Sequence, residues 1–104
     1  MKKDSYKNPV FRPFTIRKDA KVKRASTDLY DYEIITGPAR FQGKKVTKAG
    51  KTFFAVSLLR SRKGKNKFQV LQAEYVLGAS QRLAAVRKYE KAALKDYRMK
   101  TRGF

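Results

Sequence analysis

The strongest constraint on the fold is a pair of apolar segments, residues 51–60 and 67–77, separated by a short polar connector. Both segments are rich in Phe, Val, Leu and Tyr, which suit a pleated, partly buried surface. The connector contains Gly64 and Asn66, which tolerate the positive φ that a chain reversal needs. Five of the eight residues in 60–67 are cations and none is acidic. We therefore predict a β-hairpin with a basic tip.

The residues before this hairpin predict additional strands. Segment 29–36 alternates Tyr and Ile with Asp and Glu, the period-2 pattern of a strand with one wetter face. Segment 39–47 is a weaker strand candidate, in which Gly43 would mark a bulge. Residues 48–50 are expected to form a tight turn into the hairpin. Together these segments predict a small antiparallel meander of three or four strands.

The periodicity changes after Gly78. Ser80 is suited to be an N-cap, and residues 80–100 contain strong helix formers without proline or glycine. We predict one C-terminal α-helix there. The side expected to pack on the sheet is a narrow row at three- and four-residue steps, made of Leu83, Val86, Glu90, Ala93 and Tyr97.

Residues 1–28 are predicted to form an extended basic N-terminal arm. Pro9 and Pro13 disfavour a helix, because each fixes φ and removes a backbone donor. The apolar residues of the arm, such as Phe11 and Phe14, would dock on the domain or on a partner. The fold class is therefore α+β, with a single small domain over residues 29–104.

The composition excludes several classes of site. Without cysteine there is no disulfide or thiolate ligand, and without histidine zinc or iron binding is not expected. We predict no metal, no other cofactor and no small-molecule substrate. No apolar run approaches the ~20 residues of a membrane-spanning helix, and we do not expect a membrane partner. The expected location is the cytoplasm or the interior of a large particle, such as a nucleoprotein or a virion.

Catalysis has little support in this sequence. Asp31 and Glu33 would point the same way from a strand, as a paired-carboxylate or divalent-metal site requires. The alternative is that they lie on the exposed face of that strand and pair with nearby Lys or Arg. We favour this alternative, because no histidine, cysteine or third carboxylate completes a site. A Gly-rich phosphate loop is also missing. We predict that the protein is not an enzyme and has no catalytic residues.

Nucleic-acid binding has better support. A net charge of +19 and a pI near 10.5 are typical of a protein that binds the phosphate backbone, because bound Lys and Arg release condensed counterions. The cations occur in the arm, in the hairpin tip with the turn before it, and along the helix. The predicted contact residues are Arg17, Lys18, Lys21, Lys23, Arg24, Lys44, Lys45, Arg60, Arg62, Lys63, Lys65, Lys67, Arg82, Arg87, Lys88, Lys91, Lys95 and Arg98.

Aromatic residues beside these cations could stack on unpaired bases, which favours RNA over DNA. Phe53 and Phe54 cannot both point inward from one regular strand, so one of them is the better stacking candidate. The other aromatic candidates are Phe41, Phe68, Tyr75, Tyr89 and Tyr97. The aromatic signature of an RRM domain, the G-x-x-G of a KH domain and the cysteines of a zinc finger are absent.

These observations predict a non-enzymatic protein that binds RNA or DNA through phosphates and acts as a structural part of a larger nucleoprotein assembly. The alternative is a structural assembly protein, such as a capsid-associated component, whose basic surface contacts acidic protein partners. Salt dependence of nucleic-acid binding and cross-linking within native particles would distinguish the two.

Overall fold

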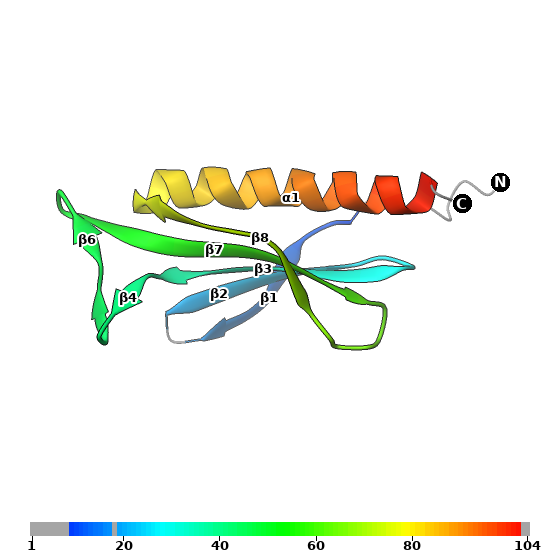
Figure 1. Cartoon of the computed structure of the whole chain (residues 1–104), viewed down its shortest axis with the longest axis horizontal. Helices are drawn as coiled ribbons and strands as arrows, with labels where there is room; N and C mark the ends of the chain where they lie inside the picture. The colour runs from blue at the N-terminus through cyan, green and yellow to red at the C-terminus, as the bar shows by residue number, and fades with distance from the viewer. Residues whose placement is uncertain (1–8, 18, 103–104) are drawn as a thin grey trace.

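The computed structural model describes residues 9–17 and 19–102 and shows an antiparallel sheet followed by one C-terminal helix (Figure 1). At the centre of the sheet is β7 (Lys51–Arg62), which pairs with β3 (Tyr30–Pro38) on one side and β8 (Gln69–Leu77) on the other. The helix α1 (Gly78–Arg102) covers one face. The α+β class, the β7–β8 hairpin and the C-terminal helix are thus confirmed.

Two further strands, β1 (Arg12–Arg17) and β2 (Ala20–Ser26), extend the sheet beyond β3. We predicted an arm outside the domain. Its residues 12–17 and 20–26 are extended, but they form two paired strands that join the sheet through β2. Pro13 is tolerated because β1 is an edge strand with an irregular register next to it. The sequence did not reveal β2 as a strand, because cations occupy both of its faces, Lys21 and Lys23 on one and Arg24 on the other. Residues 1–8, also assigned to the arm, lie outside the described residues.

The connection between β3 and β7 forms a small flap, residues 39–50. The prediction of one strand over residues 39–47 was wrong, because the chain reverses at Gln42 (φ 53°) and Gly43 (φ 80°). The resulting two-residue strands are β4 (Arg40–Phe41) and β5 (Lys44–Lys45), and β6 (Thr47–Lys48) then pairs with the start of β7. The turn expected at residues 48–50 is present, with positive φ at Ala49 and Gly50. The flap lies at one end of the sheet (Figure 1).

The core lies between α1 and the sheet. Side chains of β3 and β7, including Tyr32 and Leu58, pack against buried residues of α1. The buried helix row consists of Ala85, Tyr89, Ala93 and Tyr97. Our predicted row was therefore only partly right: Ala93 and Tyr97 are buried, whereas Leu83 is 47% exposed. We assigned Leu83 to the buried row because it is hydrophobic. In the structure, large tyrosine and small alanine side chains alternate along the buried row and pack closely against the sheet.

The helix begins earlier than predicted, and Ser80 is not its N-cap. Gly78 adopts φ 86° at the end of β8, a conformation for which glycine is suited. The backbone N–H of Leu77 donates to Oε1 of Gln81 at 2.9 Å, so the side chain of Gln81 reaches back to the preceding strand. The chain can therefore turn from β8 directly into α1 and run back over the sheet.

Candidate nucleic-acid interface

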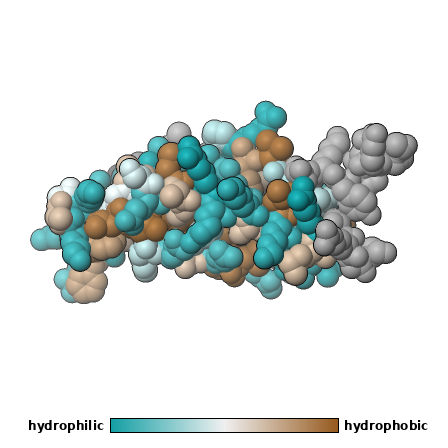
Figure 2. All heavy atoms as spheres, turned by 90° about the horizontal axis from the view of Figure 1, so that it is seen from above, coloured by the Kyte–Doolittle hydropathy of each residue, from teal (hydrophilic) through white to brown (hydrophobic). Residues whose placement is uncertain are grey.

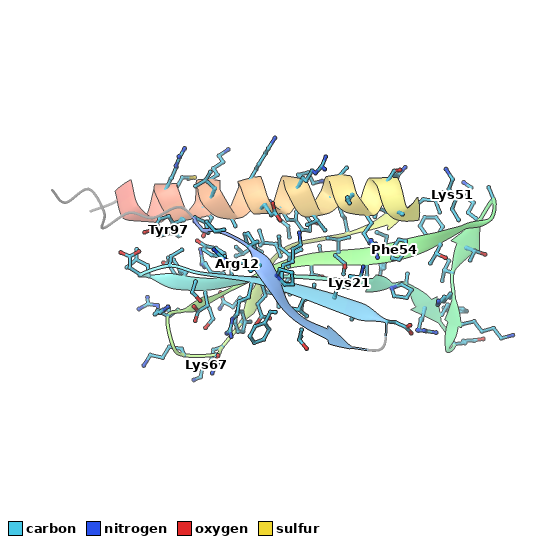
Figure 3. All side chains as sticks on the ribbon, turned by 180° about the vertical axis from the view of Figure 1, so that it is seen from behind. Arg12, Lys21, Lys51, Phe54, Lys67 and Tyr97 are labelled. Carbon is cyan, nitrogen blue, oxygen red and sulfur yellow. The ribbon has the colours of Figure 1, made fainter. Side chains whose placement is uncertain are left out.

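The outer side of α1 is a row of cations. Arg87, Lys91, Lys95 and Arg98 follow one another at steps of four and three residues, so they share one side of the helix, opposite the buried row. All four are exposed. Within the part of the chain that the structure describes, Arg87, Lys91 and Lys95 have no ion-pair partner. Nitrogen-tipped side chains stand on the side of α1 that faces away from the sheet (Figure 3). We call these four residues the helix row.

A second basic surface is a cleft between the tip of the β7–β8 hairpin and the C-terminal end of α1. Its volume is about 420 Å³, large enough for a phosphate group with part of its sugar. No carboxylate lines it. The lining residues are Tyr30, Arg60, Ser61, Arg62, Lys65, Lys67, Gln69 and Lys100. We call this the tip cleft. Lys67 lies on the side of the sheet away from α1 (Figure 3).

The hairpin tip is held in shape by Asp31 of β3. Asp31 is 6% exposed, accepts a hydrogen bond from the backbone N–H of Gly64 at 3.2 Å, and lies 3.8 Å from Nζ of Lys63. The N–H of Lys67 donates to Oγ of Ser61 at 2.9 Å. Gly64 and Asn66 have the positive φ predicted for them. The cations of the tip are therefore presented on a fixed loop, which lowers the entropic cost of binding an anion.

Arg60 has a structural role at the edge of this cleft. Its Nη1 lies 2.9 Å from both carboxylate oxygens of Asp96, and its guanidinium lies over the ring of Tyr30, 4.7 Å from the centroid. Asp96 also accepts a 2.8 Å hydrogen bond from Oη of Tyr32. Burial, and then the hydrogen bond to Asp96, raise the pKa of the Tyr32 hydroxyl. Most of the charge of Arg60 is therefore neutralised within the protein, and the remaining cations of the cleft are better placed to bind a ligand.

Every carboxylate among the described residues is engaged within the protein. Asp28 accepts a hydrogen bond from Oη of Tyr97, and the other carboxylates form ion pairs with cations. The six pairs are Lys23–Glu90, Arg24–Glu33, Arg40–Asp19, Arg60–Asp96, Lys63–Asp31 and Lys88–Glu74. These pairs divide the cations into two groups. Of the cations outside these pairs, Arg87, Lys91 and Lys95 lie in the helix row and Arg62, Lys65, Lys67 and Lys100 line the tip cleft, whereas others, such as Lys44 and Lys45 on the flap, are spread over the rest of the surface.

Asp31 and Glu33, considered as a possible metal pair, thus have other roles. They lie on the same face of β3 and each pairs with its own cation, as predicted, but that face is not the exposed one we expected, because the side chains of Asp31 and Glu33 are only 8% and 15% exposed. The described residues contain no group of three or more metal-ligating side chains.

Other predicted contact residues lie farther from these two surfaces. Lys21, Lys23 and Arg82 surround a small apolar pocket of about 140 Å³ between β2, β3 and α1. Arg82 also lies over Phe54 at 4.6 Å. Lys44 and Lys45 are exposed on the flap. The side chain of Arg17 and all of Lys18 lie outside the described residues.

Arg24 occupies the opposite face of the sheet from α1. Its guanidinium carbon lies 4.7 Å from the ring centroid of Phe14 and 5.6 Å from that of Phe68. It also pairs with Glu33 at 3.5 Å. Arg24 therefore joins β1, β2, β3 and the hairpin tip, and we regard it as a structural residue that is largely occupied by these contacts.

Lys100 was not among the predicted contact residues, although it lines the tip cleft. The position of Lys100 near the hairpin tip could have been predicted from the lengths of β8 and α1. The strand β8 leads away from the tip for nine residues, about 30 Å at 3.3 Å per residue. The helix returns for 25 residues, about 37 Å at 1.5 Å per residue. The last turns of α1 must consequently reach the level of the tip.

The aromatic candidates divide by burial. Tyr89 and Tyr97 are fully buried, so they are core residues and do not stack on a base. Phe53 and Phe54 occupy opposite faces of β7, as predicted for neighbours on a strand: Phe54 lies on the face that α1 covers, under Arg82. Phe41 and Tyr75 are the most exposed, at 69% and 73%, but neither lines the tip cleft.

Figure 2 shows the molecule from the side of α1. Hydrophilic residues predominate on this face, with hydrophobic patches between them. None of the described helices is long and apolar enough to cross a membrane. Comparison with protein-family models, with curated proteins and with solved structures finds no match, so the function must be inferred from the chemistry of this surface alone.

Proposed function

We propose that this protein binds nucleic acid through its phosphates, with the tip cleft and the helix row as contact surfaces, and that it serves as a structural component of a nucleoprotein assembly. The observation that carries the proposal is the division of the cations. The carboxylates neutralise one set, whereas Arg62, Lys65, Lys67 and Lys100 remain together around one cleft without a carboxylate in its lining.

The arrangement of charge favours an extended polyanion over a small anion. Lys100, in the last turns of α1, lines the tip cleft, so the cleft adjoins the C-terminal end of the helix row. The helix row extends from residue 87 to residue 98, about 17 Å at 1.5 Å per residue. Backbone phosphates of a single strand or a duplex can be contacted over such a length, whereas one bound phosphate would fill only the cleft.

The direct test is a filter-binding titration of the purified, nuclease-treated protein at several salt concentrations, with a single-stranded RNA and a duplex DNA as probes. We expect binding at low salt and a fall in affinity of at least about tenfold between roughly 50 and 200 mM salt, because phosphate contacts release counterions. A preference for the single strand would support RNA. Absence of binding at low salt, or binding insensitive to salt, would overturn the proposal.

The competing partner is an acidic protein surface. Cross-linking in native particles distinguishes the two, since our proposal predicts that lysines of the tip cleft cross-link to nucleic acid. Cross-links from Lys65, Lys67 and Lys100 to protein alone would favour the assembly-protein alternative.

A further inference from the structure

The single helix covers only part of the sheet. The helix α1 packs on β3, β7 and β8, whereas β2 lies one strand farther out in the sheet order. In Figure 1, β1 and β2 lie farther from α1 than β7 does. Lys23 of β2 lies opposite Ile34 of β3 and pairs with Glu90 of α1, so its face of β2 is the one that faces the helix. Lys21 lies on the same face, because it is two residues away along the strand.

Where the sheet extends past the helix, the structure has the apolar pocket of about 140 Å³ that adjoins β2, β3 and α1. Its apolar walls are the buried Ile34, the half-buried Val86 and Leu83, which is 47% exposed. An apolar cavity of about 150 Å³ accepts benzene, so this pocket has room for one phenyl or branched aliphatic side chain. We call it the lateral pocket.

Three cations surround the lateral pocket, and no carboxylate lines it. Among the described residues, Lys21 and Arg82 have no ion-pair partner. Arg82 is held over the ring of Phe54, 4.6 Å from the centroid. The third cation, Lys23, lies 3.4 Å from Glu90, and both side chains are partly open to solvent, so this pair is weak and exchangeable. The site therefore combines an apolar floor with a positive rim.

We propose that the lateral pocket binds a segment of an acidic partner protein, with one apolar side chain in the pocket and neighbouring carboxylates on the cationic rim. This inference goes beyond the proposed function, because the lateral pocket and the tip cleft share no lining residue. A partner protein could be held here while nucleic acid occupies the tip cleft. Lys21, Lys23 and Arg82, which we predicted as nucleic-acid contacts, are thereby assigned to a protein partner.

The chemistry of the lining favours an apolar side chain over a nucleobase. The amino and imino groups of a base need acceptors, and Lys and Arg side chains have none. The hydroxyl of Thr36 is the one uncharged polar side-chain group among the lining residues. A base in this pocket would therefore lose hydrogen bonds to water without replacing them, whereas an aliphatic or phenyl group has no such bonds to lose.

The carboxylates must come from another kind of protein. Every carboxylate among the described residues is already engaged within the chain. A second copy would offer the same engaged carboxylates and would be repelled by its net charge of +19. An acidic protein is instead attracted by the charge of the whole molecule and matches the rim of the pocket.

The test is a titration of isotope-labelled, nuclease-treated protein with a synthetic peptide that has one phenylalanine between pairs of aspartates, followed by the NMR shifts of backbone amides. We expect the first shifts at residues 21–23, 34–36 and 82–86, before any at the hairpin tip. A peptide with alanine in place of the phenylalanine should bind at least about tenfold more weakly, because it leaves the pocket unfilled.

Three results would overturn the inference: equal affinity for the two peptides, shifts confined to the hairpin tip, or shifts of the pocket amides caused by single-stranded RNA and not by the peptide. The last would identify a base as the occupant. None of these results depends on whether nucleic acid binds the tip cleft, which the filter-binding titration measures separately.

Two variants of equal net charge locate the contact. A pocket variant with Lys21→Gln and Arg82→Gln should raise the dissociation constant of the phenylalanine peptide by about three- to tenfold, because two ion pairs are lost. A flap variant with Lys44→Gln and Lys45→Gln should leave it nearly unchanged, and circular dichroism must show that both variants fold. Equal losses in the two variants would rule out the lateral pocket.

The substitution Leu83→Glu is a second check that leaves the cations in place. Leu83 is half-exposed, so the variant should fold, and its carboxylate would repel the acidic peptide and remove one apolar wall. We expect the dissociation constant of the phenylalanine peptide to rise by at least about tenfold. Unchanged binding in the folded variant would contradict the inference.

Discussion

The most informative perturbation for stability is Asp96→Ala. Asp96 accepts two 2.9 Å contacts from Nη1 of Arg60 and a 2.8 Å hydrogen bond from Tyr32. The side chains of Arg60 and Asp96 are 18% and 23% exposed. Removing the carboxylate leaves a mostly buried guanidinium without its anion and a fully buried tyrosine without its acceptor.

The magnitude follows from these contacts. Breaking a fully buried ion pair by removing one partner costs about 3–5 kcal/mol. Water can reach this partly exposed pair, which reduces that figure, whereas the lost acceptor of Tyr32 adds to it. We therefore expect Asp96→Ala to lower the free energy of unfolding by about 2–4 kcal/mol, a large part of the ~5–15 kcal/mol that is typical of a domain.

The assay is urea unfolding followed by circular dichroism, in a double-mutant cycle with Arg60→Met. The cycle should give a coupling energy of about 1–3 kcal/mol between the two residues. Asp96→Asn, which keeps an acceptor for Tyr32 and loses the charge, should have an intermediate stability. A loss below about 0.5 kcal/mol for Asp96→Ala would refute the structural role assigned to Arg60 and Asp96, since changes of that size are usual at ordinary surface positions.

Two further predictions concern the fold. Burial raises the pKa of Tyr89 from 10.0 to about 12, so Tyr89 ionises first in the unfolded protein; its contribution to stability should be intact below pH 10 and decline by up to ~1.4 kcal/mol per pH unit toward pH 12. Tyr32, whose pKa is also raised, adds to the decline, so Tyr89→Phe should reduce its slope without abolishing it in urea unfolding measured against pH, and an unchanged slope would contradict the assignment. Gly78→Ala should cost about 1–2 kcal/mol, because a side chain at φ 86° is strained. An added Cβ would meet only the flexible Lys51 side chain at 3.3 Å, so a much larger loss in urea unfolding would contradict this reasoning.

The sequence predicted the parts of the fold that show a clear local pattern. The β7–β8 hairpin, its positive-φ residues Gly64 and Asn66, and the C-terminal helix all follow from alternation, turn chemistry and helix propensity. The flap and β2 were missed. Gln42 gives no strong signal for positive φ, and the strand pattern of β2 is concealed because its solvent-facing and helix-facing positions both carry cations.

The candidate interface was predictable only in part. Cations can be counted in a sequence, but their neutralisation depends on contacts between distant residues, as in Arg60 with Asp96 and Lys23 with Glu90. Those partners are 36 and 67 residues apart. Lys100 was predictable from element lengths, because the helix must return to the hairpin tip.

The central claim is that nucleic acid binds at defined surfaces, the tip cleft together with the helix row, and not through diffuse positive charge. Its most direct test compares two variants of equal net charge: a cleft variant with Arg62→Gln, Lys65→Gln and Lys67→Gln, and a flap variant with Lys44→Gln, Lys45→Gln and Lys48→Gln. The measurement is the slope of log affinity against log salt for each. We predict that the cleft variant loses about 2–3 units of slope while the flap variant remains close to the unmodified protein. Equal losses in both variants, in folded protein, would contradict the claim.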